Sequence, residues 1–235
     1  MLRKLAHSVA IALLAGLGAG SAAKALTIST SASSADGWRA IAPVGNLEGQ
    51  PITAVGLAWE AAHVGWNTSI TFDDSDAAGW HTPVYRDVIQ YGATTTNSIW
   101  ADAGGDTPAY FRKIFTLEGD PVLAEMGGAF FATDASSVID DDAQVYLNGT
   151  LIYDDEDLFP TTFPIADVTG LLHAGENLIA VKAQDSVGGD EHFSLTLRIT
   201  AIPEPSPALL VALGLAALSR RSTRHQRTGT TVNMA

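Results

Sequence analysis

Carboxylates are the most abundant side chains with catalytic or metal-binding capacity in this sequence of 235 residues, which has 26 acidic residues, 13 basic residues and no cysteine. Calcium takes roughly six to eight hard oxygen ligands, which adjacent carboxylates and loop carbonyls can supply. Clusters of this kind are Asp73-Asp74-Asp76, Asp140-Asp141-Asp142 and Asp154-Asp155-Glu156-Asp157. A structural calcium held by Asp140, Asp141 and Asp142 is one hypothesis, and no other cofactor is expected. The alternative is that these aspartates cap turns by bonding their own backbone.

Sequence motifs of the common hydrolases are missing. There is no Gly-x-Ser-x-Gly nucleophile elbow. No His-Glu-x-x-His pair is present to hold zinc. Glycoside hydrolysis needs two carboxylates about 5–9 Å apart across a cleft, and the 25 acidic residues between 26 and 202 do not single out a pair. We therefore expect a protein that is not an enzyme, and a cryptic hydrolase is the enzymatic alternative.

Exposed aromatic rings are the usual platforms for the apolar faces of sugars, while carboxylates and amides bond the hydroxyls. All five tryptophans fall between residues 38 and 100. The candidates for carbohydrate binding are Trp66, Trp100, Tyr91 and Tyr153. Packing in the core is the alternative for each tryptophan, because these rings are highly buried on average.

The middle of the chain has the periodicity of antiparallel β-strands. Apolar residues from Phe193 to Ile199 alternate with polar ones, and this period of two places one face of a strand in a core. The other clear strands are expected at 109–117, 128–133, 144–153 and 177–183. We therefore expect one all-β domain over 26–202, an antiparallel β-sandwich with a less regular first half.

A hairpin is expected inside 144–153. Asn148-Gly149 supplies the positive φ angles of a two-residue type I′ turn. In that register Val145 and Leu147 share a face with Ile152 and Thr150.

Arg112 and Lys113 are adjacent on the expected strand 109–117, so their side chains leave opposite faces. An unpaired buried charge is costly. The one that points inward is expected to pair with a carboxylate.

Charge is distributed unevenly along the chain. Residues 26–205 contain six basic and 26 acidic residues, a net charge of −20, whereas 1–25 and 206–235 contain basic residues and no acidic ones. A strongly acidic body repels a phosphate backbone, so nucleic acid is not an expected partner. Basic flanks beside apolar segments are typical of sequences that stay on the cytoplasmic side of a membrane.

The first 25 residues have the three parts of a secretory signal peptide. Arg3 and Lys4 precede an apolar stretch from Val9 to about Ala19. The small residues Ala23 and Ala25 then form an Ala-x-Ala site. The Sec export machinery is therefore an expected partner, and cleavage is predicted after Ala25. An uncleaved anchor helix is the alternative.

The closing stretch reads PEPSPALLVALGLAALSRR. Proline does not fit inside a helix, so a helix is predicted from about 206 to 219, roughly 21 Å long at 1.5 Å per residue. That is short of the roughly 30 Å hydrocarbon core, and arginines that snorkel toward the cytoplasmic face would help it to span. An apolar hairpin or a core helix is the alternative. Residues 222–235 are expected to form a basic and polar cytoplasmic tail.

This stretch resembles the PEP-CTERM sorting signal of Gram-negative bacteria. The resemblance rests on Pro203, Glu204 and Pro205, the short apolar helix, and Arg220 and Arg221, so that the signal covers 203–221. It implies a protein held transiently in the inner membrane until an exosortase processes it, and then sent to the cell surface or outside, often with exopolysaccharide. The chain departs from the family pattern by continuing for 14 residues after Arg221.

The body is similar to the galactose-binding-like jelly roll, found as the sugar-binding domain of family 2 glycoside hydrolases. The similarity rests on YFRK at 110–113, YLNG at 146–149 and GENLIAV at 175–181, and it covers about 160 residues. The resemblance implies a β-sandwich in which Trp38 and Trp80 are structural. It does not imply a single activity, since function is carried by sites rather than by folds.

These observations predict an exported, non-enzymatic protein of the cell surface or extracellular matrix, with extracellular polysaccharide as its candidate ligand. The alternative is a structural or adhesive module that binds protein, with calcium as a candidate stabiliser.

Overall fold

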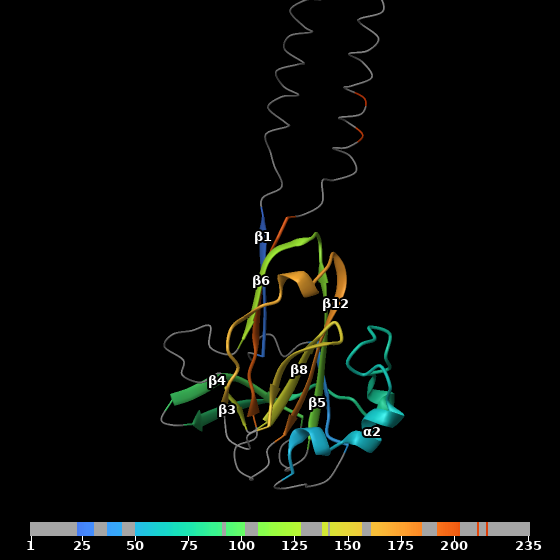
Figure 1. The fold of residues 1–235 in the computed structure, drawn as a ribbon, viewed down its shortest axis with the longest axis vertical. Coiled ribbons are helices and arrows are strands. Elements are labelled where there is room, and N and C mark those ends of the chain that lie inside the picture. The colour runs from blue at the N-terminus through green and yellow to red at the C-terminus, as the bar shows by residue number, and fades with distance from the viewer. Residues whose placement is uncertain are drawn as a thin grey trace, which may run out of the picture. The chain divides into compact units, whose positions relative to one another are not determined.

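The computed structural model describes residues 23–30, 37–43, 50–90, 93–101, 108–127, 138–140, 142–156, 161–184 and 192–202, together with Val211 and Leu215. Residues Ala23–Ile202 form one compact unit (Figure 1). Its described elements are antiparallel strands with three short 3-10 helices and one α-helix of six residues. The all-β class expected from the sequence is confirmed.

Three sheets make up the unit. Sheet A has the order β1 (Lys24–Ser29), β14 (Thr196–Ala201), β6 (Pro121–Gly127) and β11 (Ala166–Asp167). Sheet B has the order β2 (Trp38–Ile41), β5 (Ala109–Leu117), β12 (Gly175–Gln184), β8 (Asp142–Leu147) and β9 (Thr150–Asp155). Sheet C has the order β10 (Thr161–Thr162), β7 (Val138–Asp140), β13 (His192–Phe193), β4 (Ala93–Trp100) and β3 (Val84–Gln90).

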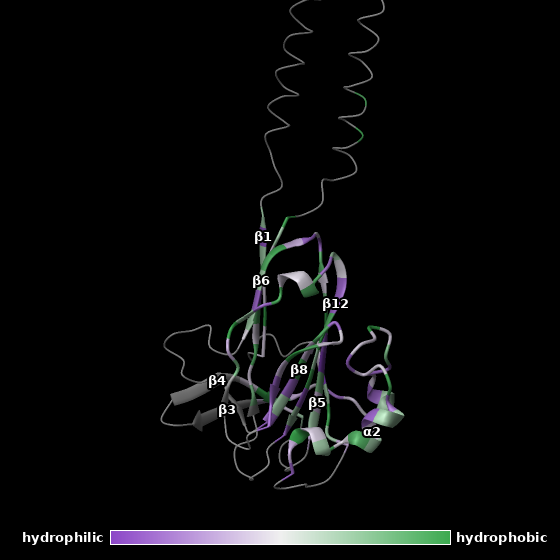
Figure 2. Cartoon of the chain, viewed as in Figure 1, coloured by the Kyte–Doolittle hydropathy of each residue, from purple (hydrophilic) through white to green (hydrophobic). Residues whose placement is uncertain are grey.

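Sheets A and C both pack on one face of sheet B, because the main core joins buried side chains from all three. It combines residues of β5, β8 and β12 with residues of β6, β14, β4 and β13. Aromatic rings cross between the layers: the centroids of Trp38 and Phe193 are 6.1 Å apart, and those of Phe111 and Phe193 are 5.4 Å apart. Hydrophobic and hydrophilic residues are mixed along the strands, as a two-layer arrangement requires (Figure 2).

The opposite face of sheet B is buried as well, which the sequence did not predict. All eight residues of β12 from Asn177 to Gln184 are buried. The cover is the segment 50–81, which contains η1 (Ile52–Ala54), α2 (Leu57–Ala62) and η2 (Asp76–Ala78). We call this segment the lobe. It explains why a tryptophan-rich region with weak periodicity belongs to the fold.

The hairpin is confirmed with one correction. Asn148 and Gly149 have φ angles of 49° and 81°. Leu147 pairs with Thr150 as expected, but a bulge between Val145 and Tyr146 places Val145 opposite Tyr153 rather than Ile152. An extra residue on one strand shifts every later pairing by one position.

The expected strand from Phe193 to Ile199 is divided between two sheets. Phe193 ends β13 in sheet C, and Thr196 begins β14 in sheet A. The alternation persists, since Phe193, Leu195, Leu197 and Ile199 are all buried. The expected strand at 128–133 lies outside the described residues.

The two ends of the compact unit leave it side by side. β1 and β14 are antiparallel neighbours, and Lys24 is paired with Ala201 (Figure 1). The backbone N–H of Ile202 donates to the carbonyl of Asp120, 3.3 Å away. Within the described residues, no helix is both long and apolar enough to cross a bilayer. Apart from the helical positions Val211 and Leu215, the helix expected at 206–219 lies outside the described residues.

Candidate functional site

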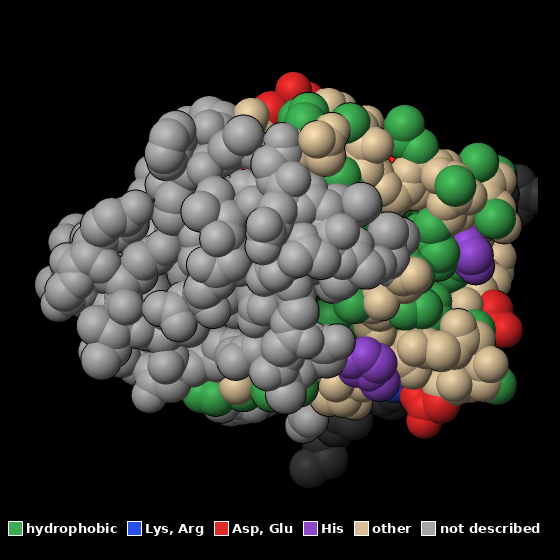
Figure 3. Space-filling model, turned by 90° about the horizontal axis from the view of Figure 1, so that it is seen from below, with side chains coloured by type: hydrophobic (Ala, Val, Ile, Leu, Met, Phe, Trp, Pro, Cys, Tyr) green, Lys and Arg blue, Asp and Glu red, His purple; other side chains and the backbone are tan. Residues whose placement is uncertain are grey.

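The lobe is the described region with the densest aromatic and polar side chains, so it is the candidate site. Its small core lies on the outer face of sheet B and contains Trp66 and Trp80 from the lobe with Tyr110, Leu178 and Ala180 from the sheet. Figure 3 shows the end of the domain to which the lobe belongs, where hydrophobic side chains are interspersed with acidic and histidine side chains.

Three rings are stacked at α2. Trp59 and His63 are one helical turn apart, so their side chains lie on the same face of the helix. Their ring centroids are 4.3 Å apart with an interplanar angle of 14°. The ring of Tyr110 lies 4.2 Å from Trp59, on β5 beneath the helix. Nδ1 of His63 lies 2.7 Å from the Trp59 carbonyl, so Nδ1 carries the donating hydrogen.

Beneath α2, a buried lysine is paired with a helix carboxylate. Nζ of Lys182 lies 2.5 Å from Oε1 of Glu60 and donates to the carbonyl of Val55 at 2.8 Å. The hydroxyl of Tyr110 donates to the same Oε1 at 3.0 Å. Lys182 is 1 % exposed, so without Glu60 its charge would be buried unpaired. Glu60 therefore fixes α2 to the sheet.

Gly56 makes this arrangement sterically feasible. It precedes α2 with a φ of 70°, a left-handed conformation that side chains rarely adopt. A Cβ at this position would lie 1.8 Å from the Tyr110 hydroxyl. Only glycine lets the chain approach the tyrosine this closely.

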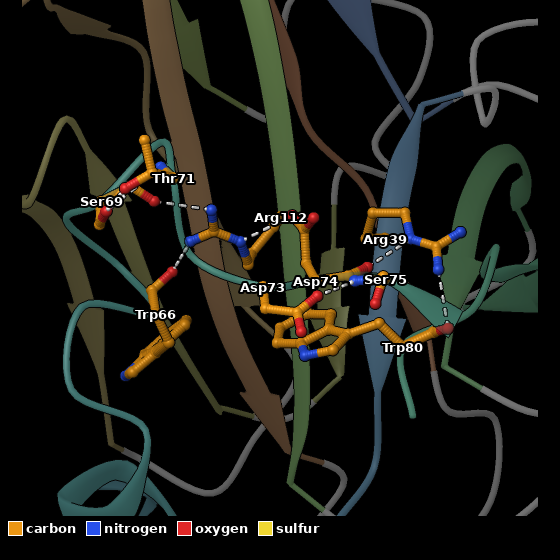
Figure 4. A network of polar contacts seen from close by, with 9 residues as sticks. All are labelled: Arg39, Trp66, Ser69, Thr71, Asp73, Asp74, Ser75, Trp80 and Arg112. Atoms are coloured by element: carbon orange, nitrogen blue, oxygen red, sulfur yellow. Dashed lines mark hydrogen bonds and ion pairs between the residues drawn. The ribbon is translucent and has the colours of Figure 1, made fainter. Parts of the chain in front are cut away.

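Arg112 connects the sheet to the loop 66–75 (Figure 4). Nε donates to Oδ2 of Asp74 at 2.9 Å, and the two terminal nitrogens donate to the carbonyls of Ser69, at 2.8 Å, and of Trp66. The ring of Phe72 lies 5.0 Å from the guanidinium carbon. Arg112 is fully buried, so the expected pairing of an inward-pointing charge with a carboxylate is confirmed.

Arg39 on β2 holds the next part of the same loop (Figure 4). It donates to the carbonyls of Asp74 and Trp80 at 2.9 and 2.7 Å and forms an ion pair with Asp76. The backbone N–H of Ser75 donates to Asp73 at 3.2 Å. All three carboxylates of the first acidic cluster are therefore engaged by arginines or by a turn.

Burial sets the protonation states in this region. Burial, and then the charge of Glu60, raise the pKa of Tyr110 far above its usual value, and burial also raises the pKa of Tyr146. Burial lowers the pKa of Arg112, while the hydrogen bond and charge of Asp74 oppose that shift. The tyrosines therefore remain neutral hydrogen-bond donors at neutral pH, which is a structural role.

Two of the four predicted sugar platforms are wrong. Trp66 and Trp100 are 3 % and 0 % exposed, so neither presents a ring face to solvent. Trp66 packs edge-on against Tyr110 in the lobe, and Trp100 packs against Phe111 in the main core. Tyr153 is half-buried against Phe163, with ring centroids 4.6 Å apart. Tyr91 lies outside the described residues.

Burial of Trp38 and Trp80, which the sequence similarity implied to be structural, is observed. The residues that sequence reasoning missed are Trp59, Glu60 and His63. The available signal was the spacing of Trp59 and His63, four residues apart between Gly56 and Gly65. A helix of six residues is too short to give a periodic pattern.

The candidate calcium ligands are only partly described. Asp142 is a buried residue of β8, Asp140 belongs to β7 and its side chain is not described, and Asp141 lies outside the described residues. Among the described side chains, no group of three or more histidines and carboxylates converges as a metal site would require. The calcium hypothesis stays a prediction.

The predicted processing residues lie at the ends of the compact unit. Ala23 precedes β1, and Ala25 is inside it, paired with Thr200. Pro203, Glu204, Pro205, Arg220 and Arg221 lie outside the described residues.

The chain has limited similarity to parts of larger enzymes of known structure. No family model and no curated protein matches the sequence. β-Glucuronidase 2 of Bacteroides uniformis is 15% identical over 75% of this chain and 18% of its own, with a TM-score of 0.40. The exo-chitosanase of Amycolatopsis orientalis is 16% identical over 69% of this chain and 21% of its own, with a TM-score of 0.38.

A third similar structure is the β-D-mannosidase of Dictyoglomus thermophilum. It is 22% identical over 34% of this chain and 9% of its own, with a TM-score of 0.25. The chain thus spans about a fifth or less of each of these three enzymes. Likeness at this level assigns neither a family nor an activity.

Proposed function

We propose that this chain is an exported, non-enzymatic surface protein with a galactose-binding-like sandwich that is attached to the membrane at one end. The observation that carries the proposal is the pairing of β1 with β14, which after cleavage still runs from Leu26, opposite Ile199, to Ser29, opposite Thr196. It brings the exits toward the predicted signal peptide and the predicted sorting signal together at one end of the sandwich. A domain with both membrane-directed segments at one end can fold while either one is still in the bilayer.

The order of events follows from the two segments. The Sec machinery exports the chain, and the signal peptide is removed after Ala25. The helix at 206–219 then holds the protein in the inner membrane, with Arg220 and Arg221 on the cytoplasmic side. An exosortase recognises Pro203, Glu204 and Pro205 and releases the domain to the surface of a Gram-negative cell.

Fractionation of cells that contain an exosortase tests this sequence of events. A variant with Pro203, Glu204 and Pro205 all changed to alanine should accumulate in the inner membrane, while the unchanged chain reaches the surface fraction. The matched control replaces Arg224 and Arg227, outside the motif, with alanine and should be sorted normally. Recovery of the unchanged chain from the cytosol with its first 25 residues intact would contradict the proposal.

Extracellular polysaccharide is the proposed ligand, and the lobe is the surface proposed to bind it. The supporting feature is the stack of half-buried Trp59 and His63, with the ring of Phe72 centred 6.5 Å from that of His63. A glycan array probed with residues 23–202, which form one compact unit, tests this ligand class. We expect binding that Trp59→Ala weakens, with His173→Ala, outside the lobe, as control. A uniform absence of signal would contradict carbohydrate binding.

A protein-binding or adhesive role is the second candidate. It is supported by exposed apolar side chains of the lobe, Leu57 at 56 % and Val64 at 83 %, since exposed apolar patches mark interaction surfaces. Calcium would stiffen such a module through Asp140, Asp141 and Asp142. Equal melting midpoints with calcium and with a chelator would contradict the calcium hypothesis.

A further inference from the structure

Exposed apolar side chains gather at the end of the domain from which both chain ends leave. We call this end the exit face and define it by Leu26, Val122, Leu123 and Ile202, which are 37 %, 52 %, 49 % and 53 % exposed. At this end of sheet A, Leu123 lies opposite Thr200 on one face and Leu26 lies opposite Ile199 on the other, and Ile202 follows directly on β14. The end of β14 beside β1 is hydrophobic in Figure 2.

A shallow groove of about 230 Å³ opens at this face, crossing sheet A from β1 over β14 to β6. Its lining alternates small and apolar residues with one cross-strand pair of opposite charge, Arg198 facing Glu125. Before the signal peptide is removed, Lys24 and Glu118 form a second pair of opposite charge at the same end.

We propose that the exit face lies against the lipid surface while the C-terminal helix is in the membrane. This inference rests on the proposed function, because it requires the segment 206–219 to be inserted. Only Pro203, Glu204 and Pro205 separate Ile202 from Ser206. Four steps of an extended chain reach at most roughly 14 Å, so the exit face is held within that distance of the start of the membrane helix.

The lipid surface is favoured over another partner for two reasons. The short connection brings this end to the bilayer without any additional binding energy. The exposed leucine, isoleucine and valine side chains at the exit face suit the boundary between headgroups and acyl chains, where buried apolar area drives interfacial binding. The lobe also has exposed apolar residues, but it lies farther along β12. Its contact with that strand is at Lys182, seven residues from Gly175, which corresponds to about 23 Å along the strand.

The absence of cysteine allows a clean test on residues 26–235, the chain that remains after the predicted cleavage, so that the signal peptide does not itself anchor the protein. Two single-cysteine variants, Leu123→Cys at the exit face and Val64→Cys in the lobe, are labelled with an environment-sensitive fluorophore. Each is reconstituted into phosphatidylethanolamine and phosphatidylglycerol vesicles that carry a spin-label quencher on the headgroup. Thermal melts of the labelled chains establish that both retain the fold.

We expect the label at position 123 to shift its emission to the blue and to be quenched, and the label at position 64 to match its emission without vesicles. Equal quenching at the two positions, or none at position 123, would overturn the inference. Flotation of the vesicles distinguishes failure of the proposed function from failure of the membrane contact alone. A chain that does not float with the vesicles contradicts insertion of the tail, and hence the proposed function. A chain that floats with an unquenched label at position 123 contradicts only the membrane contact.

Discussion

Replacing Arg112 with methionine should weaken the attachment of the lobe to sheet B and lower the stability of the domain. Arg112 is fully buried and donates to one carboxylate and two carbonyls. Methionine retains the stem but leaves these three acceptors without their donor. Breaking a buried ion pair by removing one partner typically costs about 3–5 kcal/mol. We expect a loss in that range, because the Asp74 side chain is only 23% exposed and water hydrates it poorly.

The matched control is Lys24→Met. The ion pair of Lys24 with Glu118 is exposed on both sides, 63% and 66%, so its loss should cost no more than about 1 kcal/mol. Urea unfolding of residues 23–202, followed by tryptophan fluorescence, measures both losses. The variant should still fold, since domains of this size typically have about 5–15 kcal/mol of stability.

Hydrogen exchange locates the effect. If Arg112 secures the lobe, amides in 50–81 should exchange faster in Arg112→Met, while those of β12 inside sheet B keep their protection until global unfolding. A second variant, Arg112→Lys, keeps the charge but can satisfy fewer of the three acceptors. Its stability should lie between that of the unchanged chain and that of Arg112→Met. The reasoning is refuted if Arg112→Met costs no more than Lys24→Met, or if exchange rises uniformly over the domain.

Three further predictions concern two single positions and the start of β1. The folded-state pKa of Tyr110 is raised above its unfolded value, so the stability that this difference contributes is full below about pH 10. It is lost as the pH rises further, at up to about 1.4 kcal/mol per pH unit. Tyr110→Phe should flatten this alkaline slope of the unfolding free energy in urea titrations, and an unchanged slope would contradict the assignment. Gly56→Ala should destabilise the domain by about 1–3 kcal/mol through its clash with Tyr110, whereas Gly170→Ala, which meets nothing within 4 Å, should be near neutral by thermal melting. A chain that begins at Leu26 lacks two of the six paired residues of β1, so it should be about 1 kcal/mol less stable to urea than one that begins at Lys24; equal midpoints would show that this end of β1 is frayed.

The strands with strong local signals could be predicted from the sequence. The expected strand at 109–117 is β5 without any change of bounds, and 177–183 lies within β12. The Asn148-Gly149 turn was predictable because two adjacent positive φ angles need these residue types. β1 was missed because Lys24 and Ala25 were assigned to a cleaved signal, and only pairing with β14 makes them a strand.

The candidate site was largely unpredictable. Trp66 and Trp59 are the same residue type seven positions apart, yet Trp66 is buried and Trp59 is only half-buried. Nothing local distinguishes them, because burial depends on which face of sheet B the lobe covers. Likewise, the sequence around Asp74 does not indicate that its partner is Arg112, which is 38 residues away.

The sequence by itself determined the all-β class, the type I′ hairpin and the need for an inward-pointing Arg112 or Lys113 to find a carboxylate, because turn conformation, strand periodicity and the cost of an unpaired buried charge are all local properties. Only the structure decided that the inward residue is Arg112. Tertiary structure alone decided that sheet B is covered on both faces, that the aromatic rings of the lobe are mostly structural, and that both chain ends leave at one end. These features depend on long-range packing, in which residues that are distant in sequence exclude water from one another, and such contacts leave no periodic trace along the chain.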